Sequence, residues 1–165
     1  MNLIVNVTQD WGIGLGDSLL VSLSPDLRHF RETTQGHTVV LGRKTLLTFP
    51  NAKPLPKRRN LILSTASDFT VEGAQVVHSV AELLQSLAPD EEVWVIGGES
   101  VYRQLLPYCR RAIVTKTFVT RPADRFFPNL DELPEWHLAR QEPLQNYEGI
   151  AFQFLTYQNR APQRL

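Results

Sequence analysis

The sequence predicts an α/β fold with a mainly parallel central sheet, helices on both faces and an antiparallel C-terminal edge. Short apolar segments of strand type alternate with helical segments along most of the chain, which is typical of a parallel sheet covered on both faces. The last two apolar segments have no helix between them, so we expect them to form the antiparallel edge. A length of 165 residues predicts one domain, residues 1–165.

Seven segments are predicted to be strands because they are short, apolar and rich in β-branched residues. The first has no basic region ahead of it, so we expect a strand there and not a signal peptide. The strands are expected at residues 3–7, 38–41, 61–63, 76–77, 93–96, 112–119 and 151–157.

Four helices are predicted from their start and stop signals. In the first, Ser24 suits the N-cap and Pro25 the first helical position. The third opens with Ser79 and Glu82 in the spacing of a capping box. The helices are expected at residues 24–34, 43–48, 79–87 and 99–106.

Asp26 lies in the first turn of the first helix, at the edge of an apolar stripe formed by Leu23, Leu27 and Phe30. A carboxylate half inside an apolar wall is costly unless it has a partner, and such a wall can hold an acid ready for a polar ligand. The simpler interpretation is that Asp26 complements the helix dipole. This segment alone leaves both interpretations open.

Two glycine-containing turns are candidates for binding phosphate. Gly42 ends a strand and is followed by Arg43 and Lys44 at the start of a helix, where free N–H groups favour anions; the alternative is two solvated surface charges. Gly97-Gly98 lies between a buried strand and a helix, where a pyrophosphate can rest on bare backbone; the alternative is a plain tight turn.

Two further segments are less specific. The segment Gly12–Gly16 lacks the spacing of a dinucleotide fingerprint, and we expect it to be a mobile, glycine-hinged loop that closes over a site. Lys57, Arg58 and Arg59 follow a proline-rich turn, and arginine can hold a carboxylate through two parallel hydrogen bonds. The spacing does not determine which of these three cations points inward.

The composition narrows the classes of partner. Lys and Arg balance Asp and Glu at 17 each, so no basic field indicates nucleic acid. No segment approaches the roughly 20 apolar residues of a membrane span. The single cysteine, Cys109, fits a reducing cytoplasm. The four histidines are scattered with no metal-ligand spacing, and no apolar stripe is left over for an interface, so we expect a monomer.

Taken in order along the chain, these residues resemble the dihydrofolate reductase family over nearly the whole length. Each motif is weak alone, but an accidental match of all of them in register is improbable. The motifs are Gly12-Ile13-Gly14, Asp26-Leu27 with Phe30, Leu41-Gly42-Arg43-Lys44-Thr45, Pro54-Leu55-Pro56 with Arg58 and Asn60, Ile96-Gly97-Gly98 with Val101-Tyr102, Thr115, and Phe127-Pro128.

The resemblance implies roles on the substrate side. Asp26 would bind the pterin 2-amino group and N3 and promote protonation of N5 through water, and Thr115 would hydrogen-bond Asp26 and the pterin amine. Arg58 would hold the glutamate α-carboxylate of dihydrofolate. The pterin and aminobenzoyl pocket would be lined by Leu27, Phe30, Phe49 and Leu55, with Val5, Ile13 and Ile96 flanking the pterin and nicotinamide.

The resemblance also implies NADPH as the cofactor. Gly97 and Gly98 would receive its pyrophosphate through a cis peptide bond. The adenosine phosphates would be held by Arg43, Lys44, Thr45, Ser64 and Thr65. The other implied cofactor contacts are Gly14, Leu15, Gly42, Ser100, Val101 and Tyr102.

The chain departs from the family pattern at three places. Many members have Leu-Pro-Trp where this chain has Leu19-Leu20-Val21, and that tryptophan holds a water near the pterin. Some bacterial members have arginine in place of Ser100, so more of the 2′-phosphate contact is expected to fall on Arg43 and Lys44. A common glycine is replaced by Glu99, which puts a carboxylate near the pyrophosphate turn unless its side chain faces away.

The sequence therefore predicts an enzyme that reduces 7,8-dihydrofolate to tetrahydrofolate with NADPH and feeds one-carbon metabolism. Two alternative functions are less consistent with these residues. A pyrimidine reductase of riboflavin synthesis has a similar fold, but its ribityl phosphate does not call for a clamp such as Arg58. A non-catalytic nucleotide-binding module would have no use for a carboxylate such as Asp26 facing the pocket.

Overall fold

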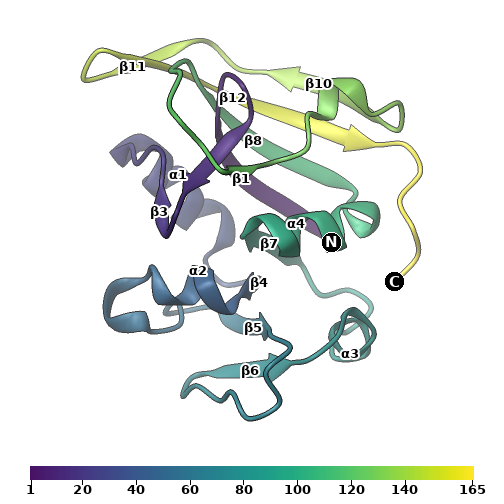
Figure 1. The fold of residues 1–165 in the computed structure, drawn as a ribbon. Coiled ribbons are helices and arrows are strands. Elements are labelled where there is room, and N and C mark those ends of the chain that lie inside the picture. Colours follow the sequence, from purple (N-terminus) through teal and green to yellow (C-terminus); the bar gives the residue numbers. More distant parts are fainter.

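The computed structural model describes residues 1–165 and is built on one large sheet that runs through the molecule (Figure 1). The strand order is β10-β12-β8-β1-β7-β4-β5-β6, with β11 added beside β12. The pairings from β8 to β6 are all parallel, and β12 joins β8 in antiparallel orientation. The predicted fold class, including the antiparallel C-terminal edge, is confirmed.

The strands of this sheet are β1 Asn2–Thr8, β4 Thr38–Gly42, β5 Arg59–Leu63, β6 Ala74–Val77, β7 Val93–Gly97, β8 Arg111–Thr117, β10 Trp136–Gln141, β11 Gln145–Tyr147 and β12 Ile150–Asn159. The predicted segments fall within or next to these bounds, whereas β10 and β11 were not predicted. Both are largely exposed, so they lack the apolar signal by which strands are recognised.

Four α-helices cover the sheet, two on each face. Their bounds are α1 Ser24–Thr34, α2 Arg43–Leu47, α3 Val80–Gln85 and α4 Glu99–Leu105, with 3₁₀ turns at Pro50–Ala52, Leu106–Tyr108 and Leu130–Glu132. Because side chains alternate along β1, Leu3 packs in a cluster with α3 and α4, whereas Ile4 packs in a second cluster with α1 and α2. No helix of the molecule has the length and apolar character that a membrane crossing requires.

The helix ends differ in detail from the predictions. Helix α1 begins at Ser24, so Leu23 takes the N-cap position and no side chain caps it. Helix α3 is capped as predicted, since Ser79 Oγ accepts from the Glu82 N–H at 3.0 Å. The Glu82 carboxylate accepts from the His78 N–H at 2.8 Å rather than from that of Ser79, and the helix ends at Gln85, short of residue 87.

The glycine segment after β1, which was predicted to be a mobile, glycine-hinged loop, contains short strands. Gly12–Leu15 is β2, which pairs with β3 (Ser18–Leu19) and with β9 (Arg125–Phe126) in a small antiparallel sheet. The pairing with β9 comes from a segment distant in sequence, so no local pattern indicates it.

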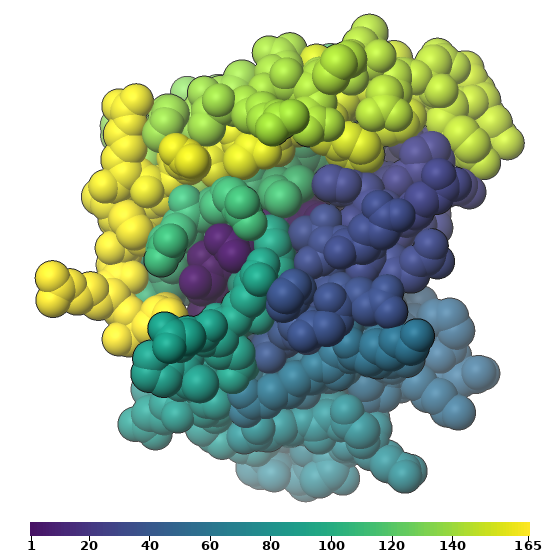
Figure 2. Space-filling model, turned by 180° about the vertical axis from the view of Figure 1, so that it is seen from behind, coloured from purple at the N-terminus to yellow at the C-terminus, as the bar shows by residue number.

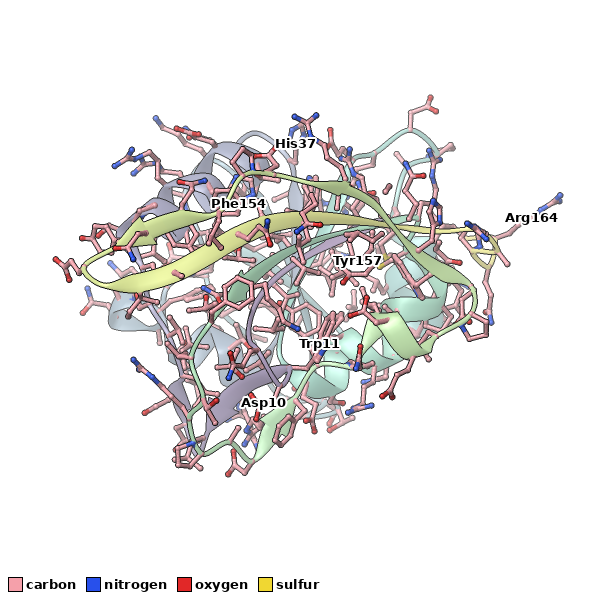
Figure 3. All side chains as sticks on the ribbon, turned by 90° about the horizontal axis from the view of Figure 1, so that it is seen from above. Asp10, Trp11, His37, Phe154, Tyr157 and Arg164 are labelled. Atoms are coloured by element: carbon pink, nitrogen blue, oxygen red, sulfur yellow. The ribbon has the colours of Figure 1, made fainter.

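Trp11 anchors this small sheet to the core. Its ring stacks on Phe127 at 6.2 Å between centroids and meets Tyr157 edge-on at 6.1 Å. Lys116 Nζ lies 4.2 Å from the centre of the same ring. Figure 3 shows Trp11 beside Tyr157 of β12, with Asp10 further out near the β2 segment.

The opposite side of the molecule is seen in Figure 2. The α1 region lies there between the C-terminal strands above and the β5–β6 region below.

Asn60 organises the proline-rich turn that precedes β5. Its side chain is 2 % exposed, and its Oδ1 accepts from the Leu55 N–H at 3.0 Å. Its Nδ2 donates to the carbonyls of Leu55 at 2.9 Å and Arg58 at 3.1 Å. One buried amide thus satisfies three backbone groups of the turn that carries Leu55 and Arg58.

We expect Asn60→Ala to lower the free energy of unfolding by about 2–4 kcal/mol, because three hydrogen bonds are lost and the backbone groups that they satisfy remain partly buried. Urea unfolding followed by circular dichroism measures the change. Asn146→Ala is the matched control, since exposed Asn146 makes one such bond, to the Gly149 N–H at 3.1 Å. Equal small losses in both variants would show that the Asn60 side chain does not hold the turn.

Candidate active site

A cleft of about 610 Å³ opens where β4, β5 and β7 end. Its walls come from α1, α2, the start of α4 and the β2–β3 hairpin, with β1 contributing to its floor. The carboxyl ends of parallel strands are the usual place for a ligand in such sheets. Segments that are distant in sequence therefore line one continuous cavity.

Asp26 lines this cleft, and both of its carboxylate oxygens accept hydrogen bonds from the sheet. Thr115 Oγ1 donates to Oδ1 at 2.5 Å, and Asn6 Nδ2 donates to Oδ2 at 2.9 Å. Asn6 and Thr115 are paired directly across the β1–β8 ladder, which brings the two donors to one place. The carboxylate is thus tied to the sheet, so its role is not limited to complementing the helix dipole.

The apolar wall around Asp26 is formed by residues from several elements that are distant in sequence. Leu23 is buried at 3 % exposure, but Leu27 is 55 % exposed and lies on the open side of the cleft. The predicted stripe on α1 is therefore not one buried face, because the helix lies across the boundary between core and cleft. The other predicted apolar residues in the cavity wall are Val5, Ile13, Phe30, Phe49 and Ile96.

The start of α2 and the start of α4 approach closely at the other arm of the cleft. A Cβ built on Gly42 would lie 3.1 Å from Val101 Cγ2, and one on Gly98 would lie 3.4 Å from Thr45 Oγ1. Neither helix start has a side-chain cap, so backbone N–H groups remain available there. The Gly97–Gly98 bond is cis, as the resemblance implied.

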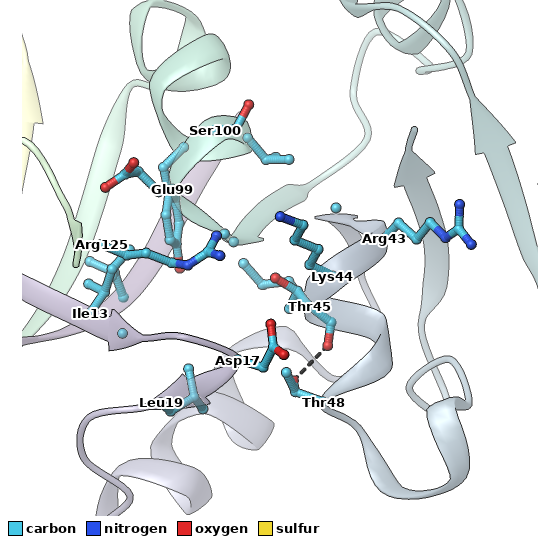
Figure 4. Close-up of a pocket in the computed structure, with 18 of the residues that line it drawn as sticks. Ile13, Asp17, Leu19, Arg43, Lys44, Thr45, Thr48, Glu99, Ser100 and Arg125 are labelled. Carbon is cyan, nitrogen blue, oxygen red and sulfur yellow. Dashed lines mark hydrogen bonds between the residues drawn. The ribbon is translucent and has the colours of Figure 1, made fainter. Parts of the chain in front are cut away.

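Cations enter this arm from two directions. Figure 4 shows Lys44 and Arg125 pointing into the cleft from opposite sides, with Asp17 near Thr48 below them. Arg125 comes from β9, and its Nε donates to the Gly16 carbonyl at 3.2 Å. Arg125 was not predicted, because two-residue β9 gives no signal of its own.

Arg43 takes a different direction from Lys44. In Figure 4 its side chain points away from Lys44 and Ser100. Its guanidinium lies 4.6 Å from the centre of the Phe69 ring, within reach of a cation–π contact. Ser64, Thr65 and His78 line the cavity together with Arg43. The two adjacent cations therefore face different parts of the cleft.

Glu99 does not oppose an anion at the glycine turn. Its Oε2 accepts from the Phe126 backbone N–H at 2.5 Å, so the carboxylate faces β9. This bond also ties the start of α4 to the small sheet. The side chain thus faces away from the turn.

Of the three adjacent cations in the proline-rich turn, Arg58 is the one beside the apolar wall. Its guanidinium lies 6.0 Å from the Phe30 ring centre, and its Nε and one terminal nitrogen donate to Thr34 Oγ1 and the Pro56 carbonyl. Burial, and then the charge of Arg31, lower the pKa of Arg58. Arg59 points elsewhere and pairs with Glu91 at 2.7 Å.

Tyr102 braces the floor of the cleft. Its hydroxyl donates to the Ile4 carbonyl at 2.7 Å, and its side chain is 5 % exposed. Burial, and next the nearby Asp26 charge, raise the pKa of Tyr102 far above its ordinary value. The hydroxyl therefore remains a neutral donor at physiological pH and fixes α4 against β1.

Most of the predicted site residues line the one cavity, and four do not. Thr115 lies behind Asp26 and donates to it. Leu55 packs against the same core cluster as Phe30 and Phe49, and Arg58 lies at the edge of the apolar wall. Leu15 is 47 % exposed on the β2–β3 hairpin and is outside the cavity wall. The other predicted cofactor residues found in the wall are Gly14, Gly42, Thr45, Gly97, Gly98, Ser100 and Val101.

Several residues in the wall were not predicted from the sequence. Asn6 had a signal, because it is the one polar residue within the apolar segment 3–7. Asp17, His78 and Gln104 also line the cavity, but they lie in segments with no local pattern that indicates a ligand.

The fold and cleft define an α/β enzyme with a hydrogen-bonded carboxylate at one end of its cleft. At the other end, glycines, cations and uncapped helix starts suit a phosphate group. The family model for dihydrofolate reductase matches residues 1–159. The dihydrofolate reductase of Mycobacterium tuberculosis is 43 % identical over 154 residues, which cover 88 % of this chain and 89 % of that protein. The chain belongs to the dihydrofolate reductase family.

Other relatives agree. Dihydrofolate reductase of Bacillus subtilis is 35 % identical over 150 residues, which cover 90 % of this chain and 88 % of that one. A solved structure of dihydrofolate reductase from Enterococcus faecalis, complexed with NADP(H) and RAB-propyl, superimposes with a TM-score of 0.86. It is 32 % identical and covers 96 % of this chain and 95 % of its own.

Proposed function

We propose that this chain reduces 7,8-dihydrofolate to 5,6,7,8-tetrahydrofolate with NADPH. The observation that carries the proposal is the position of Asp26, the carboxylate at the apolar end of the cleft, with each oxygen held by a donor from the sheet. The other arm of the cleft has the glycines and cations that an extended phosphate ligand requires. When bound, NADPH supplies the hydride for pterin C6.

The protein's part in this reaction is to bind, orient and manage a proton. Asp26 accepts hydrogen bonds from the pterin 2-amino group and N3, since an ionised carboxylate keeps acceptor capacity beyond its two bonds to the protein. It promotes protonation of N5 through water. Thr115 orients the carboxylate, and Leu27, Phe30 and Phe49 hold the flat rings in place.

The cofactor arm divides into two parts in this proposal. Lys44, Thr45 and the bare N–H groups at Gly97 and Gly98 hold the pyrophosphate, with Arg125 facing them across the cleft. Arg43, Ser64 and Thr65 hold the 2′-phosphate. Glycine at position 98 keeps this space open, because a Cβ there would lie 3.4 Å from Thr45 Oγ1, between the two helix starts.

The two alternative functions fit this cleft less well. The substrate of a pyrimidine reductase has no carboxylate-bearing tail that could bind to Arg58, which lies beside the Phe30 ring. A nucleotide-binding module would not need two donors committed to Asp26.

The proposal also includes the cytoplasm as location and a monomer as the active form. Buried Cys109 supports the first, and the scattered distribution of the exposed apolar residues supports the second.

Asp26→Asn should lower kcat at pH 7 by about 10²–10⁴-fold while the fold is retained, because the amide cannot promote protonation of N5. NADPH oxidation at 340 nm with saturating dihydrofolate measures this. Lowering the pH should partly restore turnover, since substrate that is already protonated bypasses the defect. Asp17→Asn, a second acid in the cleft wall, should keep nearly full kcat. Undiminished turnover of Asp26→Asn at pH 7 would contradict the proposal.

Arg58→Leu should raise KM for dihydrofolate about 10–150-fold, because a charge-assisted contact of roughly 1.5–3 kcal/mol is lost. Steady-state kinetics with dihydrofolate and with a dihydropterin lacking the glutamate tail measure the effect, and the second substrate should show almost no change. Arg59→Leu is the matched control, since Arg59 pairs with Glu91 instead. Equal effects on both substrates would show that Arg58 does not bind the tail.

Arg43→Gln should reduce kcat/KM with NADPH about tenfold or more relative to NADH, which has no 2′-phosphate. Lys44→Gln should weaken the binding of both cofactors alike, because Lys44 points into the cleft toward Arg125 in Figure 4, where the pyrophosphate common to both is proposed to bind. High salt should shrink the preference of the unsubstituted protein for NADPH, since exposed Arg43 is screened. If Arg43→Gln weakens both cofactors equally, Arg43 does not bind the 2′-phosphate.

A further inference from the structure

Asn6 is the unexpected partner of Asp26. It lies in the middle of β1 and is half-buried, whereas all the other residues from Leu3 to Thr8 are buried. Its Nδ2 donates to Asp26 Oδ2 at 2.9 Å, and its Oδ1 accepts from Thr117 Oγ1 at 2.8 Å. A chain of two hydrogen bonds therefore leads from Thr117 through Asn6 to the carboxylate.

The sheet register builds this chain. Parallel pairing sets Asn6 opposite Thr115 and Thr8 opposite Thr117, so the side chains of Asn6, Thr115 and Thr117 emerge on the same face, beneath α1. Thr115 and Thr117 are 1 % and 0 % exposed, so their hydroxyls depend on these protein partners.

Aromatic rings close this polar group on the side of β12. Phe154 and Phe152 pair with Thr115 and Thr117 across the β12–β8 ladder. Phe154 stacks on His29 of α1 at 4.1 Å between ring centroids, and Phe152 is 1 % exposed. Because the rings wall off this side, the side chain of Asn6 is held by protein groups there.

Only one orientation of the Asn6 amide suits an ionised Asp26. A carboxylate can only accept hydrogen bonds, so the NH₂ group of Asn6 must face it. Oδ1 then faces Thr117, whose hydroxyl must donate. The reverse orientation would place two acceptors together at the carboxylate. The carboxylate thus sets the direction of the amide, and Thr117 supports it by donating to Oδ1.

We propose that Asn6, held in place by Thr117, is a positioning residue for Asp26. Thr115 holds Oδ1 and Asn6 holds Oδ2. The two contacts together fix the plane of the carboxylate, and the pterin must lie in that plane to bind both oxygens. Thr115 alone would leave the carboxylate free to rotate about its Cβ–Cγ bond. This inference rests on the proposed reduction of dihydrofolate.

The test compares Asn6→Ala, Thr117→Val and Thr117→Ser in single-turnover hydride transfer with NADPH and dihydrofolate. Asn6→Ala should slow hydride transfer about tenfold or more, since a hydrogen bond to a charged group is lost. Thr117→Val should slow it about two- to tenfold, because Oδ1 of Asn6 loses its hydrogen-bond donor and the amide is held less firmly. Thr117→Ser keeps the hydroxyl and should transfer hydride at nearly the rate of the unsubstituted protein. If Thr117 acted only by packing its methyl group, Thr117→Ser should be slowed as well.

Two controls separate positioning from general damage. Asn2→Ala removes the asparagine at the start of β1, outside the cleft, and should leave the rate unchanged. Kd for NADPH should stay the same in every variant, because Asn6 acts on Asp26. In a double-mutant cycle, Asn6→Ala should add almost nothing to the loss in Asp26→Asn, since the two residues act together.

Each outcome decides the inference. An unchanged hydride-transfer rate in Asn6→Ala, or additive losses with Asp26→Asn, would overturn it, because Asn6 would then act independently of the carboxylate. If Asn6→Ala does not fold, the Thr117→Val and Thr117→Ser pair decides by the same rates. A loss in Thr117→Ser equal to that in Thr117→Val overturns the role of Thr117. Lack of dihydrofolate-dependent NADPH oxidation in the unsubstituted protein would instead refute the proposed function.

Discussion

A carboxylate half-buried beside an apolar wall is stable only where its oxygens accept hydrogen bonds, and the rest of this site follows from that constraint. The donors that meet Asp26 come from β1 and β8, whose parallel register brings Asn6 and Thr115 side by side. Helix α1 must then lie with its first turn over these two strands. One wall of the cleft is therefore set by the same contacts that hold its acid.

The cofactor arm depends on a different constraint, the close approach of two helix starts. Gly42 and Gly98 allow α2 and α4 to begin near one another, and uncapped N–H groups face the cleft between them. The small sheet of β2, β3 and β9 forms the remaining side. Glu99 joins α4 to this sheet through the Phe126 N–H, so its charge is directed away from the phosphate arm.

Much of the fold could be predicted because the strands and helices around the core carry strong apolar periodicity. The β2–β9 pairing could not, since Gly12 and Phe126 meet through tertiary contacts that leave no local pattern. The sequence indicated Asp26 and, through the resemblance, Thr115. It did not indicate Asn6 as their partner, because a single polar residue in an apolar strand does not show which side chain it faces. Arg125 was missed for a similar reason: the two-residue strand β9 is set by its pairing.

The central claim is that Asp26 is the carboxylate that meets the pterin. A crystal structure of this protein with NADP⁺ and folate tests it most directly. We expect the pterin 2-amino group and N3 to lie within hydrogen-bond distance of the Asp26 oxygens, with Asn6 and Thr115 still bonded to that carboxylate. A pterin bound against Asp17 or Glu99 instead, with Asp26 making no contact to the ligand, would contradict the claim.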